Sequence, residues 1–93
     1  MLLGDVVQEV GDSRQHTIDY RAWLGRGEVL SSVGFTVDSG TATVSNVTYS
    51  PDYTKVMFLL NGGTLGDRFN VIACATTSEG QVRYDHIAVG VIA

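Results

Sequence analysis

Apolar and polar residues alternate along much of the chain, which is the period-two pattern of strands that bury one face. The pattern is clearest between Val29 and Val37 and between Phe69 and Thr77. The residues that share an apolar face within these stretches are Val33, Phe35 and Val37, then Phe69, Val71, Ala73 and Ala75. No long stretch shows the 3.6-residue period of an amphipathic helix. The pattern therefore predicts an all-β protein.

Clusters of Gly, Asp, Ser and Pro separate the alternating stretches, and these residue types favour turns. The clusters lie at residues 11–13, 25–27, 38–40, 50–52 and 78–80. The strands expected between them are Val6–Val10, Gln15–Tyr20, Val29–Val37, Thr41–Tyr49, Lys55–Leu60, Phe69–Thr77 and Val82–Val91. About seven short strands at this spacing predict an immunoglobulin-like antiparallel β-sandwich, formed by residues 1–93 as a single domain.

Two of the expected strands change the parity of their apolar positions. In the fourth, Ala42 and Val44 are even, whereas Val47 and Tyr49 are odd. A bulge near residues 45–46 would reconcile the two halves, because a bulge adds one residue to one strand of a pair. In the last strand the parity differs between residues 82–84 and residues 87–91. We therefore expect a second irregularity between them.

The largest apolar side chains are the expected core. Trp23 is large enough to anchor that core, and its indole N–H would need a partner there. A place for Trp23 in an interface is the alternative. The expected core residues are Trp23, Phe35, Phe58, Phe69 and Val71.

Two segments carry more apolar residues than one buried face requires. Residues 55–60 read KVMFLL and are apolar on both faces, and residues 87–93 contain no charge. Exposed apolar edges invite uncontrolled pairing and are usually guarded by charges or proline. Residues 55–60 fit a central strand covered on both sides or a strand whose outer face meets a partner. The last strand either fills the core or has its outer face or end covered by another subunit. The candidate interface residues are Met57, Leu59, Ile87, Val89, Val91 and Ile92.

Composition supports a sheet and disfavours two classes of partner. The chain has 13 Val and 9 Thr, whose branching at Cβ suits strands better than helices. Its net charge is −4, so it is poorly equipped to bind nucleic acid or an anionic membrane surface. No apolar run approaches the roughly 20 residues that span a bilayer. The first residues lack the basic start of a signal peptide, so we expect synthesis in the cytoplasm.

Residues that could carry catalysis are few and scattered. Cys74 is the only cysteine and lies in an apolar run, where a buried thiol is expected. Asp19, Asp85 and His86 could form a carboxylate–histidine pair, but no serine or cysteine nucleophile sits in a recognisable turn. The glycine-rich loop that contains Gly62, Gly63 and Gly66 lacks the Lys and Ser or Thr of a phosphate-binding loop. The sequence predicts no enzyme, no cofactor and no metal site.

Four segments, in order, resemble the phage fiber–tail adaptor family of small immunoglobulin-like virion proteins. The segments are Asp12–Leu24 (DSRQHTIDYRAWL), Leu30–Val37 (LSSVGFTV), Gly62–Val71 (GGTLGDRFNV) and Thr76–Gln81 (TTSEGQ). From the first segment to the last, the resemblance extends over most of the length of the chain. The resemblance implies an immunoglobulin-like fold and a place in the joint between the tail and the fiber of a virion.

We therefore expect a non-enzymatic structural protein of the bacteriophage virion, made in the cytoplasm of the bacterial host. Its expected partners are other virion proteins of the tail, fiber or capsid, with a homo-oligomer in the particle and neither nucleic acid nor membrane. A capsid decoration or cement protein is the first alternative. A carbohydrate-binding module is the second, with Tyr49, Tyr53 and Tyr84 as the aromatic residues left to form a platform.

Overall fold

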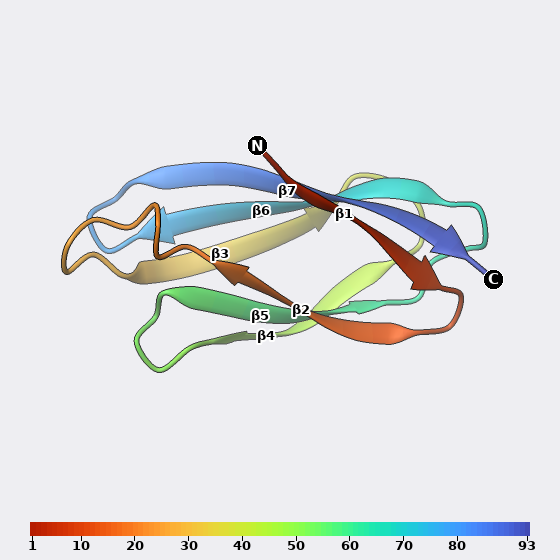
Figure 1. The fold of residues 1–93 in the computed structure, drawn as a ribbon, viewed down its shortest axis with the longest axis horizontal. Helices are drawn as coiled ribbons and strands as arrows, with labels where there is room; N and C mark the ends of the chain where they lie inside the picture. The colour runs from red at the N-terminus through yellow and green to blue at the C-terminus, as the bar shows by residue number, and fades with distance from the viewer.

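The computed structural model describes residues 1–93 and confirms the predicted all-β sandwich of seven strands. The strands are β1 (Leu2–Glu9), β2 (Ser13–Asp19), β3 (Leu30–Val37), β4 (Thr43–Tyr49), β5 (Lys55–Asn61), β6 (Arg68–Thr77) and β7 (Val82–Ile92). They form a four-stranded sheet in the order β1-β7-β6-β3 and a three-stranded sheet in the order β2-β5-β4 (Figure 1). The body is elongated and measures 43 × 23 × 17 Å. No helix that could cross a membrane is present.

The first strand corrects the prediction that every pair is antiparallel. β1 runs parallel to β7, with Val6 beside Val89, while the other strand pairs are antiparallel. The chain then crosses to the three-stranded sheet between Glu9 and Ser13, so β1 and β2 are consecutive but do not pair. β1 also begins at Leu2, earlier than the expected Val6. The orders β2-β5-β4 and β3-β6-β7 are compatible with the expected immunoglobulin-like arrangement.

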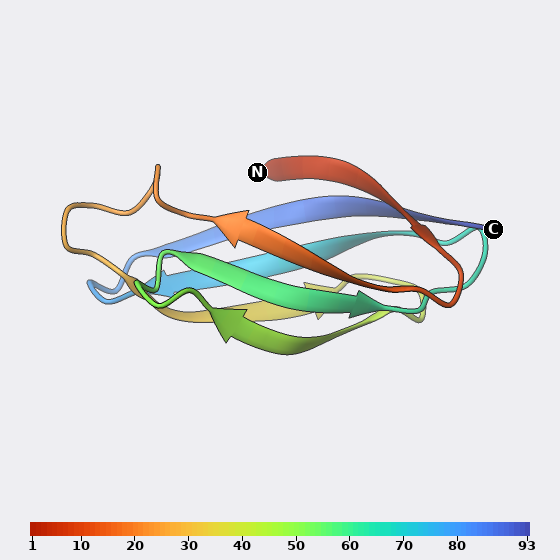
Figure 2. The ribbon, with the colours of Figure 1, turned by 60° about the horizontal axis from the view of Figure 1, so that its bottom comes forward.

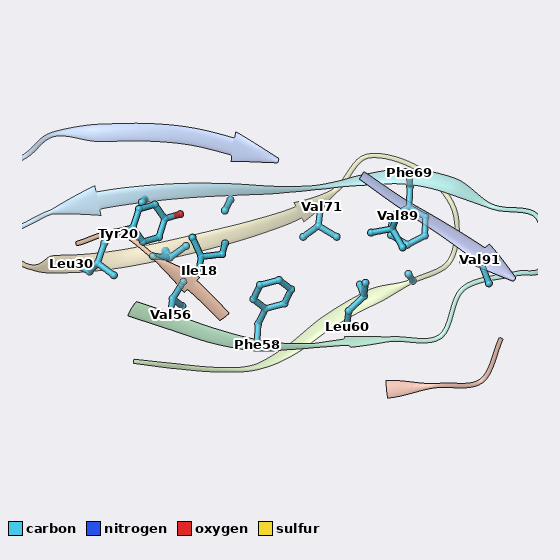
Figure 3. Close-up of a cluster of buried hydrophobic side chains, with 14 residues drawn as sticks. Ile18, Tyr20, Leu30, Val56, Phe58, Leu60, Phe69, Val71, Val89 and Val91 are labelled. Carbon is cyan, nitrogen blue, oxygen red and sulfur yellow. The ribbon is translucent and has the colours of Figure 1, made fainter. Parts of the chain in front are cut away.

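The core lies between the two sheets and is centred on β5. Alternate residues of β5 point inward, and Phe58 contacts Phe35 of β3 with 4.4 Å between the ring centres. Burial of each such side chain contributes about 1.5–3 kcal/mol. Figure 3 shows these side chains meeting those of β6 and β7 across the sandwich. The buried apolar residues from these three strands are Val56, Phe58, Leu60, Phe69, Val71, Ala73, Ala75, Val89 and Val91.

The parity change of the fourth expected strand is a bulge, as predicted. The register of β4 against β5 shifts between Ser45 and Thr48, and Asn46 has a φ of 50°. Even-numbered Val44 before the bulge and odd-numbered Tyr49 after it therefore both lie on the inner face, opposite Leu60 and Val56 of β5. Because of the bulge, Val44 and Tyr49 both pack against the core.

The irregularity expected in the last strand is absent. β7 pairs with β6 without a register shift from Val82 to Gly90. The odd residues point inward throughout, and the first two inward positions after the hairpin are taken by charged residues, the partly buried Arg83 and the buried Asp85. Val82 and Tyr84 instead point outward and are exposed. A buried charge and two exposed apolar residues produced the apparent change of phase.

Gln8 joins the two sheets at the end where β1 leaves its sheet. Its side chain is 1% exposed although β1 is an edge strand. The side-chain nitrogen lies 3.1 Å from the carbonyl oxygens of Asp12, Leu60 and Gly62, which belong to the turn after β1 and the end of β5. A polar side chain from one sheet thereby reaches a backbone acceptor of β5 in the other sheet and two acceptors in the adjoining turns.

The glycine loop after β5 closes the same end of the sandwich. Gly62, Gly63 and Gly66 have φ values of 72°, 105° and 87°. A Cβ at Gly63 would lie 2.7 Å from Cγ2 of Val91, whereas a Cβ at Gly62 would meet nothing within 4 Å. Val91 is buried and its backbone N–H bonds to Asp67, so it cannot move aside easily. Gly63 is therefore required both by its backbone and by close packing.

We expect Gly63→Ala to destabilise the fold more than Gly62→Ala does. Both substitutions place a side chain at positive φ, which costs roughly 1–2 kcal/mol. Gly63→Ala adds the collision with Val91, and overpacking of this kind costs about 1–3 kcal/mol more. Urea denaturation of the two variants measures the difference, with Gly62→Ala as the matched control. Equal losses would show that the contact with Val91 does not constrain the loop.

Candidate functional site

The side chains that could have formed a catalytic pair do not come together. Asp19 is at the exposed end of β2, where its carboxylate lies 2.7 Å from Nη2 of Arg21. Hydrogen bonds from Arg21 hold the pKa of Asp19 below its usual value. Asp85 points into the sandwich, and the adjacent His86 points out of it. No group of three or more His, Cys, Asp or Glu side chains is placed to hold a metal ion.

The other histidine belongs to the core. His16 of β2 is partly buried, and its ring centre lies 5.6 Å from that of Phe58. Burial, with a smaller effect of the nearby Arg14, lowers the pKa of His16. Such a histidine is neutral and packs as an aromatic side chain at neutral pH.

Asp85 forms a buried ion pair that the sequence did not reveal. Its side chain is 1% exposed, and Nε of Arg83 lies 2.9 Å from Oδ2. The amino group of Met1 is 3.6 Å from Oδ1. Arg83 in turn lies over Trp23, with 5.5 Å between the guanidinium carbon and the ring centre. A buried carboxylate needs such partners, because an unpaired charge in the interior is costly.

Trp23 lies at the border of the core rather than at its centre. It is partly buried, and its ring centre is 5.8 Å from that of the buried Tyr20. Its other neighbour is Arg83 of β7. Trp23 therefore covers the ion pair of Asp85 from the loop after β2. Of the other expected core residues, Phe58, Phe69 and Val71 are buried, and Phe35 is partly buried at the side of β3.

The outer face of the four-stranded sheet carries most of the exposed apolar side chains that lie on strands. Val82 and Tyr84 of β7 are 54% and 65% exposed, and Val7 of β1 is 63% exposed. Between β1 and β6 the small residues Ala88 and Gly90 leave a hollow of about 600 Å³. Aromatic anchors such as tyrosine are enriched in protein interfaces, and hollows receive the side chains of a partner.

The outer face of the three-stranded sheet has a smaller apolar centre. Met57 and Leu59 of β5 point outward and remain partly exposed. Their cross-strand neighbours are uncharged polar residues, Thr17 and Gln15 on β2 and Thr48 and Ser45 on β4. Both candidates thus lie on a free surface.

The candidate interface residues of β7 are divided between the core and the surface. Val89 and Val91 are 3% and 4% exposed and lie in the core, so they are corrected from surface to interior positions. Ile87 is partly buried and packs against the core. Ile92 points outward and is exposed. The reason is the uninterrupted alternation of β7, which turns its odd residues toward the other sheet.

We expect the stability of the fold to fall at alkaline pH through Tyr20. Burial and then the negative charge of Asp85 raise the pKa of Tyr20 to about 12, and its hydroxyl has no hydrogen-bond partner. A tyrosine in an unfolded chain has a pKa near 10. The unfolded chain therefore loses this proton first, so stability is full below about pH 10 and falls as the pH rises toward 12.

Tyr20→Phe has no proton to lose and should lack this part of the alkaline decline. Urea denaturation at several alkaline pH values measures the effect, and Tyr53→Phe at an exposed tyrosine is the control. If Tyr20→Phe and the wild-type protein lose stability in parallel, Tyr20 is not the group that couples folding to pH.

Comparisons with known proteins place the chain in a family. A search of curated proteins found no match. Among solved structures, the solution structure of Amebosin is similar, with 13% identity, a TM-score of 0.46, and 97% of this chain and 95% of that chain covered. The sequence model of the family described as "Podophage GP4 fiber-tail adaptor protein gp77" matches residues 8–90, which include part of β1 and nearly all of the other strands. The chain belongs to this family of phage fiber–tail adaptor proteins.

Proposed function

We propose that this chain is a non-enzymatic structural protein of a phage particle that joins the tail to the fiber. The observation that carries the proposal is the match of the adaptor family over residues 8–90. The family implies a place in the virion and contacts with other virion proteins. The specific partners are proposed to be a tail protein and a fiber protein, assembled after synthesis in the host cytoplasm. We also propose that the chain works as a homo-oligomer in the particle.

The distribution of side chains supports a role that depends on surfaces. The buried apolar residues occupy the space between the sheets, and the charged pair inside it joins Arg83 to Asp85. Exposed Val7, Val82 and Tyr84 lie outside this core, on the outer face of the larger sheet. A partner could cover these side chains without disturbing the core, which is what an adaptor requires.

The tyrosines give no support to a carbohydrate platform. The ring of Tyr49 stacks on Tyr53 at 5.7 Å, and its hydroxyl accepts a hydrogen bond from the backbone N–H of Val33. Tyr84 lies on the outer face of the other sheet. The three rings therefore do not form one surface.

Deletion of the gene from the phage tests the adaptor role. We expect particles that have filled heads and tails but lack fibers, because the joint between the two parts is missing. Negative-stain electron microscopy counts the fibers per particle, and expression of the wild-type chain from a plasmid should restore them. Particles that keep their fibers but lose intact capsids would show a decoration protein instead.

A further inference from the structure

Three of the four edge strands of the sandwich carry features that discourage pairing with another strand. β1 has Asp5 and Glu9, β2 has Arg14 and Asp19, and β4 has the bulge after Ser45. Charges and bulges of this kind are the usual protection of sheet edges. The fourth edge, β3, contains no charged residue and no proline between Leu30 and Val37. Its one irregularity lies at its start, between Leu30 and Ser32, and its pairing with β6 is regular from there to Val37.

The free side of β3 has no neighbouring strand, and only its first part is covered, by Tyr53 at the N–H of Leu30 and by Tyr49 at the N–H of Val33. In an antiparallel pair, alternate residues direct both backbone groups toward the neighbouring strand. Asp38 N–H bonds to Asn70 of β6, so the even residues of β3 face β6 and the odd residues face away. Consistently, the N–H of Val33 points away from β6 and donates to the hydroxyl of Tyr49. The backbone groups of Phe35 and Val37 point the same way, where the sheet has no further strand.

The core is less completely covered where the edges of β3 and β4 lie near each other. Phe35 and Val37 of β3 and Val44 and Tyr49 of β4 face the core but are only partly buried. Figure 2 shows β3 and β4 along the lower side of the sandwich, where they border the two sheets without pairing. A strand added beside β3 would therefore gain hydrogen bonds and also cover apolar side chains.

We propose that two copies of this chain pair through β3, antiparallel and around a two-fold axis at Phe35, so that the two larger sheets join into one. In this register Phe35 lies beside Phe35 of the second copy, and Val33 lies beside its Val37. The N–H of Val33 would then exchange the hydroxyl of Tyr49 for the carbonyl of that Val37. On the outer face Gly34 lies beside Thr36. On the core side, apolar residues therefore lie beside apolar residues of the second copy. The alternation of β3 thus matches that of the strand added at its free edge.

Charge favours a second copy at this edge over the charged edges of β1 and β2, and the bulge of β4 disfavours the remaining edge. Each chain carries a net charge of −4, so two copies approach most easily where no charge is present. The first carboxylate after the strand, Asp38, would lie beside Ser32 of the second copy and is held by the backbone and side chain of Asn70. The two Asp38 side chains thus avoid each other. Pairing of a single strand buries little area, so we expect a weak dimer, with a dissociation constant of about 1–100 μM.

Two double variants place charges on the proposed contact without touching the core. Gly34 and Thr36 are exposed on the outer face, and a Cβ at Gly34 meets nothing within 4 Å. In Gly34→Lys/Thr36→Lys, each new Lys would lie opposite a Lys of the second copy, and like charges placed opposite each other are destabilising. Gly34→Glu/Thr36→Glu does the same with negative charges. Gln15→Lys/Thr17→Lys, at exposed positions of edge strand β2, is the matched control.

Sedimentation equilibrium at about 100 μM measures the mass, which is 10.0 kDa for one chain. We expect the wild-type chain and the Gln15→Lys/Thr17→Lys control to be dimers and each Gly34/Thr36 variant alone to be a monomer. An equimolar mixture of the Lys and Glu variants should dimerise again, because unlike charges then face each other. This rescue separates loss of pairing from loss of folding.

A monomeric wild-type chain at this concentration would overturn the pairing, as would a mixture that stays monomeric or a control that dissociates as the Gly34/Thr36 variants do. The pairing concerns the purified chain and does not rest on the adaptor role. A monomeric wild-type chain would leave that role untouched, and a chain absent from the tail–fiber joint would leave the pairing untouched.

Discussion

The packing of β5 against the opposite sheet is the interaction on which the rest of the structure depends. Val56, Phe58 and Leu60 come from the central strand of the smaller sheet and are almost completely buried against β6 and β7. This packing uses the inner faces of both sheets. The remaining apolar surface, on the outer faces and along the edge of β3, is available to other chains. A protein with this division is suited to assembly, since partners can bind without disturbing its core.

Buried polar residues fix how the edges of the sandwich close around that core. Gln8 holds β1 to the end of β5, and Arg83 neutralises Asp85 beneath Trp23. At the same end as Trp23, Glu28 accepts hydrogen bonds from the hydroxyl of Thr77 and the N–H of Gly25, which lower the pKa of Glu28. Each residue joins segments that are distant in the sequence.

Sequence reasoning predicted the strands whose inward positions are all apolar. The alternation of Phe69, Val71, Ala73 and Ala75 identified β6, and the parity conflict around Ser45 identified the bulge of β4. The same reasoning predicted β7 as a strand but misassigned the phase of its first half, because buried Asp85 and exposed Tyr84 exchange the positions that hydrophobicity assigns them. It also missed the parallel pairing of β1, since residues 2–9 do not alternate and nothing local reveals a partner 80 residues away. Candidates for surface residues could be named from the sequence. Only the structure, which shows which side chains of β7 point inward, places Val89 and Val91 in the core.

The central claim is that this domain functions through its outer surfaces as a joint in the virion. Electron cryomicroscopy of the intact phage particle tests it most directly, because a seven-stranded sandwich of this shape can be fitted into density at high resolution. We expect the domain between the tail and the fiber, with density of partner proteins over its outer faces or along the β3 edge. Density for the domain on the capsid lattice, or its absence from the particle, would contradict the account.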